Sequence, residues 1–159
     1  MHAKFLISFV TIWLLPAAAP AADAVPAGPP AAAASESSSG TRLSATLRGA
    51  EEVDAQGKAG QGDPDGSGSF VARIDKGQLC YTLSSANIGE ATMAHIHKGA
   101  VGAGGPVFIG LPDLDGGEHC QDIDDDRAAA LRSKPETFYV NIHNDDFPAG
   151  AIRGQLTKP

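Results

Sequence analysis

The chain has 159 residues, enough for one domain, and its 12 basic and 19 acidic residues give a formal net charge of −7. Removing residues 1–21 takes away one base, Lys4, which leaves 11 basic against 19 acidic residues and a charge of −8. Such a chain has no basic patch to neutralise phosphates. This excludes nucleic acid and disfavours anionic membrane surfaces as partners.

The N-terminus has the pattern of an export signal. Lys4 precedes an apolar run of 11 residues, 5–15, which is too short to span a membrane. Small residues follow Pro16 and provide an A-x-A cleavage site that ends at Ala21. We therefore predict a signal peptide over residues 1–21 and a secreted or periplasmic protein with no membrane attachment after cleavage. An uncleaved N-terminal anchor is the alternative.

Residues 22–41 are rich in alanine, proline, serine and glycine, and Val25 is their largest apolar residue. A segment of this composition cannot bury a core, so we predict a disordered linker. A glycosylated stalk is the alternative, because serine and threonine lie near proline. The remaining residues, 42–159, form the predicted folded domain.

Short segments of alternating apolar residues in 42–159 predict strands separated by glycine- and proline-rich turns. The alternating sets lie at 43–47, 70–74, 79–83, 93–97, 107–111, 138–142 and 152–156. Residues 125–133 carry the one helix pattern, with early acids, central alanines and Pro135 just beyond, whereas 113–126 reads as a polar loop. We predict an all-β domain, an immunoglobulin-like antiparallel β-sandwich or small barrel of about seven strands with one short helix.

The domain contains two cysteines, Cys80 and Cys120. Export would place them in an oxidising compartment, where two thiols on one small domain form a disulfide. We therefore predict a Cys80–Cys120 bridge. A pair of thiolate metal ligands is the alternative.

The pattern with the most specific chemistry is His95-Ile96-His97. Residues two apart on a strand point to the same face, so both imidazoles can bind one metal ion while Ile96 faces the core. His143 ends another predicted strand on its non-core face, and it completes a three-histidine set if the two strands pair. Three imidazoles and an open position suit Cu(II) or Zn(II).

Other polar residues near these strands have a place in the same hypothesis. Asp145, Asp146 and His119 are candidates to complete or orient the metal site. The alternative for the three histidines is structural: they would hydrogen-bond loop backbone and hold strand ends together. The strand order decides between these readings, and periodicity does not supply it.

Two further kinds of chemistry find less support. Residues 63–68 resemble the start of a calcium loop, but position 12 of such a loop would be Ile74 instead of glutamate, so a glycine-rich turn explains them better. No serine lies in a G-x-S-x-G elbow, and the glycines after His97 precede no helix that could bind phosphate.

Two segments, AHIHKGAVGAGGPVFIGL (94–111) and YVNIHNDDFPAGAIRGQL (139–156), resemble the CHRD domain. That domain is named after chordin and also occurs in exported bacterial proteins. The resemblance extends from about Leu43 to Leu156 and includes a strand matched by Leu79-Cys80-Tyr81 and a later cysteine. It implies an immunoglobulin-like β-barrel with limited similarity to copper/zinc superoxide dismutases, in which an H-x-H strand supplies two copper ligands.

Three functional hypotheses follow. The first is a non-catalytic extracytoplasmic metal-binding module of copper type. The second, implied by the growth-factor binding of chordin, is a protein- or glycan-binding module without metal. In it Asn141 and Arg153 tie strands, while Gly150 and Gly154 permit turns and close packing.

The third hypothesis is a dismutase-like redox enzyme, and the sequence disfavours it. A dismutase also needs a bridging histidine and a three-ligand zinc subsite, and the domain offers only His119 and His143 beyond the H-x-H pair. The acidic surface would not steer superoxide. We therefore predict no catalytic residues. The identity of a partner and the oligomeric state do not follow from the sequence.

Overall fold

The computed structural model describes residues 40–159. The predicted signal peptide and all but the last two residues of the predicted linker lie outside the described residues. In chain order the elements are β1 (Thr41–Arg48), η1 (Gly49–Glu51), β2 (Ser67–Asp75), β3 (Gln78–Ala86), β4 (Ala91–Lys98), β5 (Val107–Gly110), β6 (Glu118–Asp122), α1 (Asp125–Ser133), η2 (Pro135–Thr137), β7 (Phe138–Asn144) and β8 (Ile152–Gln155). None of the helices in this part of the chain is long and apolar enough to span a membrane.

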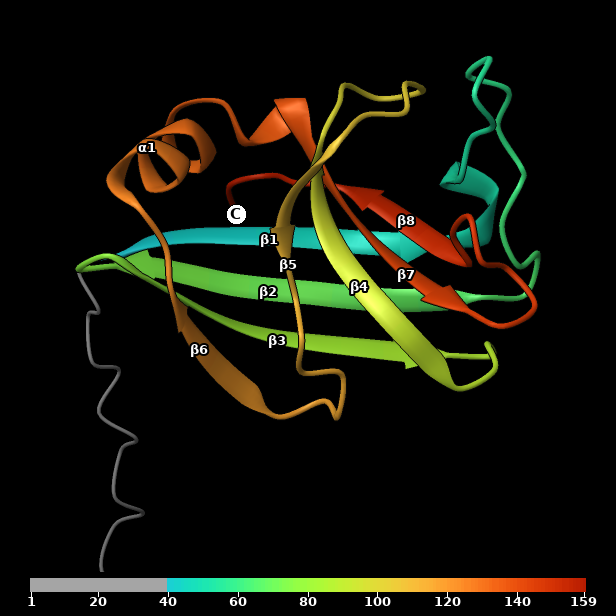
Figure 1. Ribbon diagram of the computed structural model, residues 1–159, viewed down its shortest axis with the longest axis horizontal. Coiled ribbons are helices and arrows are strands. Elements are labelled where there is room, and N and C mark those ends of the chain that lie inside the picture. Colours follow the sequence, from blue (N-terminus) through green and yellow to red (C-terminus); the bar gives the residue numbers. More distant parts are fainter. Residues whose placement is uncertain (1–39) are drawn as a thin grey trace, which may run out of the picture. The chain divides into compact units, whose positions relative to one another are not determined.

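The eight strands form one antiparallel sheet in the order β5-β4-β7-β8-β1-β2-β3-β6, which curls into a half-barrel (Figure 1). The prediction of an all-β domain with one short helix is confirmed. The sheet curls on itself instead of dividing into the two layers of a sandwich, and it has one strand more than the sequence indicated. Its two edges, β5 and β6, are linked by a side chain, since the Gln121 amide donates to the Gly110 carbonyl at 2.9 Å.

The additional strand is β6, which lies in the segment 113–126 that the sequence analysis assigned to a polar loop; that prediction was wrong. Residues 118–122 read EHCQD and have no alternation of apolar residues. The strand forms because β3 supplies a pairing partner, with Cys80 directly opposite Cys120. These two cysteines form the predicted disulfide.

Local sequence accounts well for the β2–β3 hairpin and for α1. Lys76 and Gly77 both have positive φ, 46° and 78°, as a two-residue turn that matches strand twist requires. The helix occupies the predicted residues 125–133, and the Asp124 carboxylate caps it by accepting the Arg127 amide at 2.7 Å.

The core lies on the concave face of the sheet, where the alternating apolar residues converge. The core-facing residues include Leu43, Leu47, Phe70, Ile74, Leu79, Tyr81, Leu83, Ala94, Ile96, Phe138, Val140, Ile142 and Ile152, and α1 adds Ala128 and Leu131. Burial of this apolar area is the main term that favours folding.

Strand β7 is unusual because all seven of its residues are buried. Phe138, Val140 and Ile142 face the core as predicted, so Tyr139, Asn141 and His143 point to the convex face. Their burial means that other segments cover the convex face at β7, and this covered polar layer contains the candidate site.

The disulfide generates a stability prediction. It closes a loop of 40 residues and fastens β6, which pairs along its length with β3 alone among the described strands. The Cys80→Ala, Cys120→Ala double variant should lose roughly 4 kcal/mol of unfolding free energy in the chain-entropy model, measured by urea titration. Reduction of the unmodified protein should produce a similar loss. An unchanged urea midpoint would contradict the prediction.

Candidate metal centre

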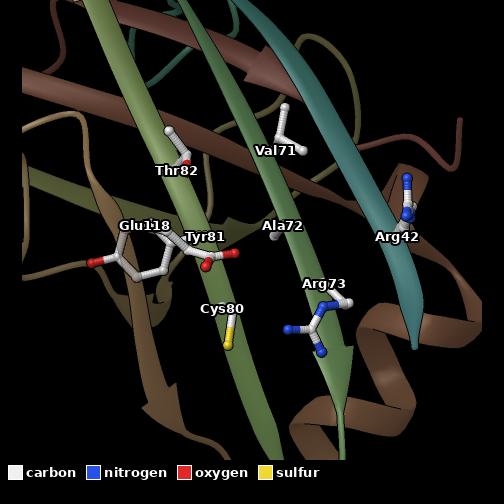
Figure 2. A pocket seen from close by; sticks show the side chains of 8 residues that line it. All are labelled: Arg42, Val71, Ala72, Arg73, Cys80, Tyr81, Thr82 and Glu118. Carbon is white, nitrogen blue, oxygen red and sulfur yellow. The ribbon is translucent and has the colours of Figure 1, made fainter. Parts of the chain in front are cut away.

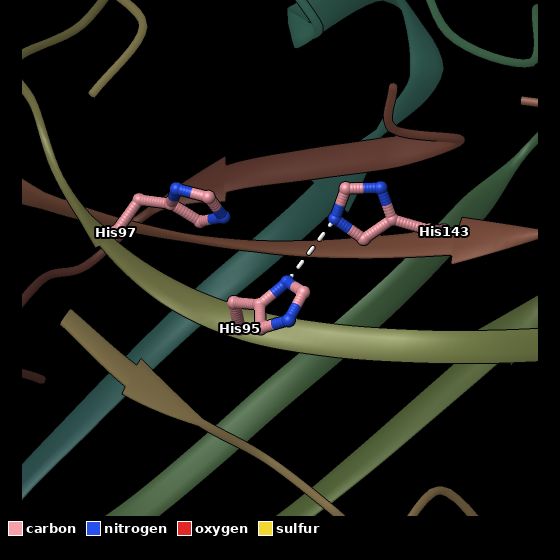
Figure 3. A group of neighbouring side chains, drawn as sticks. All are labelled: His95, His97 and His143. Atoms are coloured by element: carbon pink, nitrogen blue, oxygen red, sulfur yellow. Dashed lines mark hydrogen bonds between the residues drawn. The ribbon is translucent and has the colours of Figure 1, made fainter. Parts of the chain in front are cut away.

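The pairing of β4 with β7 brings the three predicted histidines together. In the antiparallel register Met93 lies opposite His143 and His97 lies opposite Tyr139, so His95, His97 and His143 share the convex face. One ligand nitrogen from each ring lies within 4.8 Å of the others. Figure 3 shows the three rings turned toward a common space between the strands.

Backbone carbonyls fix which nitrogen two of the rings present. The His97 Nδ1–H donates to the Gly105 carbonyl at 2.9 Å, and the His143 Nδ1–H donates to the Pro148 carbonyl at 3.0 Å. In the neutral rings, the Nε2 atoms therefore carry lone pairs. A carbonyl that accepts from the outer N–H of a metal-binding histidine is the usual means of fixing its tautomer and ring orientation.

The third ring, His95, can supply the remaining ligand nitrogen if it loses the proton on its Nδ1 atom. His95 Nδ1 lies 3.2 Å from His143 Nε2. Because His143 Nε2 is an acceptor, His95 donates from Nδ1 in the metal-free site. If that proton leaves and His95 is protonated on Nε2 instead, its Nδ1 lone pair points at the same space as the other two nitrogens.

The surroundings favour the neutral, ligating form of all three rings. Burial lowers the pKa of His95, and the neighbouring His143 and His97 lower it further. Burial also lowers the pKa values of His97 and His143, although their carbonyl hydrogen bonds oppose the shift. At neutral pH the rings therefore need not lose a charge before binding a cation.

One nitrogen of the cluster is unsatisfied. His97 Nε2 is buried and has no hydrogen-bond partner in the part of the chain that the structure describes. Burial of an unpaired polar atom is unfavourable, so such an atom needs an explanation. A metal ion bound by the three imidazoles would satisfy it, and the residues present fit such an ion.

Arg153 of β8 and Tyr139 of β7 hold the covering loop and the ring of His97 in place. The Arg153 Nη2 donates to the carbonyls of Ala100 and Ala103, at 3.1 and 2.8 Å, which fixes the loop that carries Gly105. The Arg153 guanidinium also lies 3.4 Å from the centroid of the Tyr139 ring. The Tyr139 ring in turn stacks on His97, with centroids 4.8 Å apart and planes 5° apart.

These supporting residues were not predicted as part of a site. The binding-module hypothesis gave Arg153 the role of tying strands, whereas in the structure its side chain binds loop carbonyls and an aromatic ring. Gly105 is required for the loop to approach β4, because a Cβ there would overlap the Lys98 carbonyl. The signal in the sequence was the pair of long motifs around residues 94–111 and 139–156, which contain all of these residues.

Behind the site lies a buried acid, Glu52, whose residue is 5% exposed. Burial raises the pKa of this carboxyl from its ordinary value of 4.5 to about 7, although Arg153 and the Asn141 amide oppose the shift. Its Oε1 atom has no hydrogen-bond partner among residues 40–159. Gly150 allows the carboxyl to lie there, since a Cβ at this position would overlap it.

The other candidate residues are not in the cluster. His119 lies on β6 and bonds through Nε2 to the Asp115 carboxylate at 2.6 Å; this contact raises the pKa of His119. Asp145 and Asp146 do not belong to the ligand group formed within the described residues. In the segment 63–68, the Asp63 carboxylate accepts the amide of Asp65, as the turn interpretation predicts.

Two concavities help to place the site. The first, of about 190 Å³, lies over β1, β2, β3 and β6 and is lined by residues such as Arg42, Arg73 and Glu118 (Figure 2). These residues include no histidine, so this hollow is not the metal candidate. The second, of about 430 Å³, is bordered by His95, Met93 and Gln121, so it adjoins one ring of the cluster.

These features define a disulfide-bonded β domain with a histidine cluster beneath loops on the convex face of its sheet. The family model of the CHRD domain matches residues 43–156, and the chain belongs to this family. No curated protein and no solved structure matches the chain.

Replacement of Glu52 by glutamine should change how stability depends on pH. The carboxyl titrates near 4.5 when exposed and near 7 in the fold, so its contribution is complete below pH 4.5 and is lost as pH rises through 7. This shift corresponds to about 3 kcal/mol. The unfolding free energy of Glu52→Gln, relative to the unmodified protein, should therefore rise by up to that amount between pH 4.5 and 8. Urea titrations at several pH values test this; parallel profiles for the two proteins would refute it.

Proposed function

We propose that the domain is a non-catalytic, extracytoplasmic metal-binding module of copper type, in which His95, His97 and His143 hold the ion. The observation that carries the proposal is the convergence of three neutral imidazoles whose ligand nitrogens lie within 4.8 Å of one another. Three neutral nitrogens match the preferences of Cu(II) and Zn(II).

The way the rings are held supports this choice over a purely structural role. A purely structural role would leave no buried ring nitrogen unpaired, yet His97 Nε2 has no hydrogen-bond partner within the described residues, although its Nδ1–H is bonded to Gly105. The Nδ1 bonds of His97 and His143 to backbone carbonyls leave the Nε2 lone pairs of these two rings in a shared, partly buried space. A cation bound between the rings would use these two lone pairs, together with the Nδ1 lone pair that His95 presents once its proton moves to Nε2.

The location proposed is the periplasm or the extracellular space. The Cys80–Cys120 disulfide suggests an extracytoplasmic protein, since thiols in the cytosol are kept reduced. The pattern of residues 1–21 supports export through a signal peptide. A copper or zinc ion present in these compartments would suit the three imidazole nitrogens of the site.

A protein- or glycan-binding module is the second candidate, and it predicts an exposed apolar or aromatic patch. The exposed large hydrophobic residues of the described region are Val71, Met93, Val101 and Val107. They are aliphatic and come from different strands and a loop, so they favour this candidate less than the histidines favour metal. The third candidate, a redox enzyme, would require measurable catalytic turnover in addition to metal binding.

Metal binding should depend on the three clustered histidines and not on the number of histidines in the chain. Calorimetric titration of the purified chain with Cu(II) and Zn(II) should give one-to-one binding with Kd below ~1 μM, a range suited to specific sites. Both His97→Ala and the His95→Ala, His97→Ala double variant should lose this binding because they remove ligands. Circular dichroism should show that both variants remain folded.

His119→Ala is the matched control, because His119 lies on β6 in contact with Asp115, outside the cluster. It should bind metal like the unmodified protein. Binding that is weak, or that survives in the His95→Ala, His97→Ala variant, would make the histidines structural. The search for function would then turn to extracellular protein and glycan partners.

A further inference from the structure

Asn141 is a neighbour of the histidine cluster on strand β7. It lies directly opposite His95 in the β4–β7 ladder and two residues before His143 on the same strand. Its side chain therefore shares the convex face with the three imidazoles. Although it is polar, the residue is only 3% exposed.

The oxygen of this side chain is unsatisfied. Asn141 Oδ1 is buried and has no hydrogen-bond partner within the described residues. A role in tying strands does not explain this atom, because the ladder between β7 and its neighbours is made by backbone groups. Burial of a carbonyl oxygen without a partner opposes folding, so the retention of this atom needs an explanation.

A second unsatisfied atom lies on the adjacent residue of the cluster, His97 Nε2. The two residues are close enough for Asn141 to influence the pKa of His97, which burial lowers and the Gly105 and Asn141 contacts raise. Both atoms carry lone pairs and neither carries a proton, since His97 Nδ1–H is donated to Gly105. Two acceptors cannot satisfy each other, whereas one cation satisfies both.

We propose that Asn141 Oδ1 is the fourth ligand of the metal, which completes a set of three imidazole nitrogens and one amide oxygen. The inference rests on the proposed metal function and makes it more specific. An oxygen ligand is harder than a thioether or thiolate, so this set favours divalent Cu(II) and Zn(II) over Cu(I). It also fills the position that a catalytic metal would keep open for water or substrate, as a non-catalytic site requires.

Pulsed EPR of the Cu(II)-loaded full chain tests the ligand directly. The chain has three asparagines, Asn87, Asn141 and Asn144, so selective labelling with ¹³C at the side-chain carbonyl introduces few labels. Coordination through Oδ1 should give a strong ¹³C hyperfine coupling that Asn141→Leu abolishes. It should persist in Asn144→Asp, because Asn144 has the opposite strand parity and its Oδ1 accepts the Phe147 amide.

Affinity supplies a second measurement. Asn141→Leu should weaken Zn(II) binding about 10-fold or more in competition with a chromogenic chelator, while Cu(I) affinity changes less. Asn141→Asp keeps the shape of the side chain and adds charge, so it should strengthen Zn(II) binding. If the Asn141→Leu protein does not fold, the Asn141→Asp variant provides the test in its place. The same added charge in Asn144→Asp should have a smaller effect.

The outcomes separate this inference from the function on which it rests. If the unmodified protein binds no metal, or if His97→Ala retains binding, the proposed function fails. If binding requires His97 but the ¹³C coupling is absent, or if Asn141→Leu leaves Zn(II) affinity unchanged, the function stands and the assignment of Asn141 is overturned.

Discussion

The antiparallel pairing of β4 with β7 is the constraint on which the candidate site depends. The two strands are separated by 39 residues in the chain, and β5, β6 and α1 lie between them in sequence. Their register places His143 opposite Met93 and Asn141 opposite His95, so all the candidate ligands lie on one face. A slip of one residue would turn His143 toward the core and Ile142 outward. The apolar residues of the concave face thus fix the register that assembles the polar group on the convex face.

The second requirement is that the convex face is covered at this point. Loops after β4 and β7 lie over the histidines and provide the Gly105 and Pro148 carbonyls that accept their Nδ1 protons. Arg153 keeps the first loop in place through two carbonyls and also stacks on Tyr139. The cover removes water from the rings, and this is the main reason why their pKa values are lowered. Exposed histidines on a bare strand would keep ordinary pKa values and free rotation, and would bind a cation less selectively.

Much of this arrangement follows from local pattern, and the part that does not has identifiable causes. Alternation identified seven strands and the shared face of His95 and His97, because each depends on residues close in sequence. Strand β6 escaped detection because its EHCQD sequence gains its stability from β3 and from the disulfide. The adjacency of His143 depended on strand order, which periodicity does not encode. Burial of Asn141 was equally hidden, since polar residues on the outward face of a strand ordinarily meet water and only the covering loops reverse that expectation.

The buried polar layer also explains why a fold of this size retains groups that oppose its stability. Glu52, Asn141 and His97 each contain a buried atom without a hydrogen-bond partner in residues 40–159, and all three contribute to the region beneath the loops. Apolar substitutes of similar shape would avoid the desolvation cost. A layer selected for stability alone would therefore be apolar on both faces of β7. The metal ion proposed above would account for this polar character, because a cation held by three imidazoles and an amide oxygen would return the lost free energy on binding.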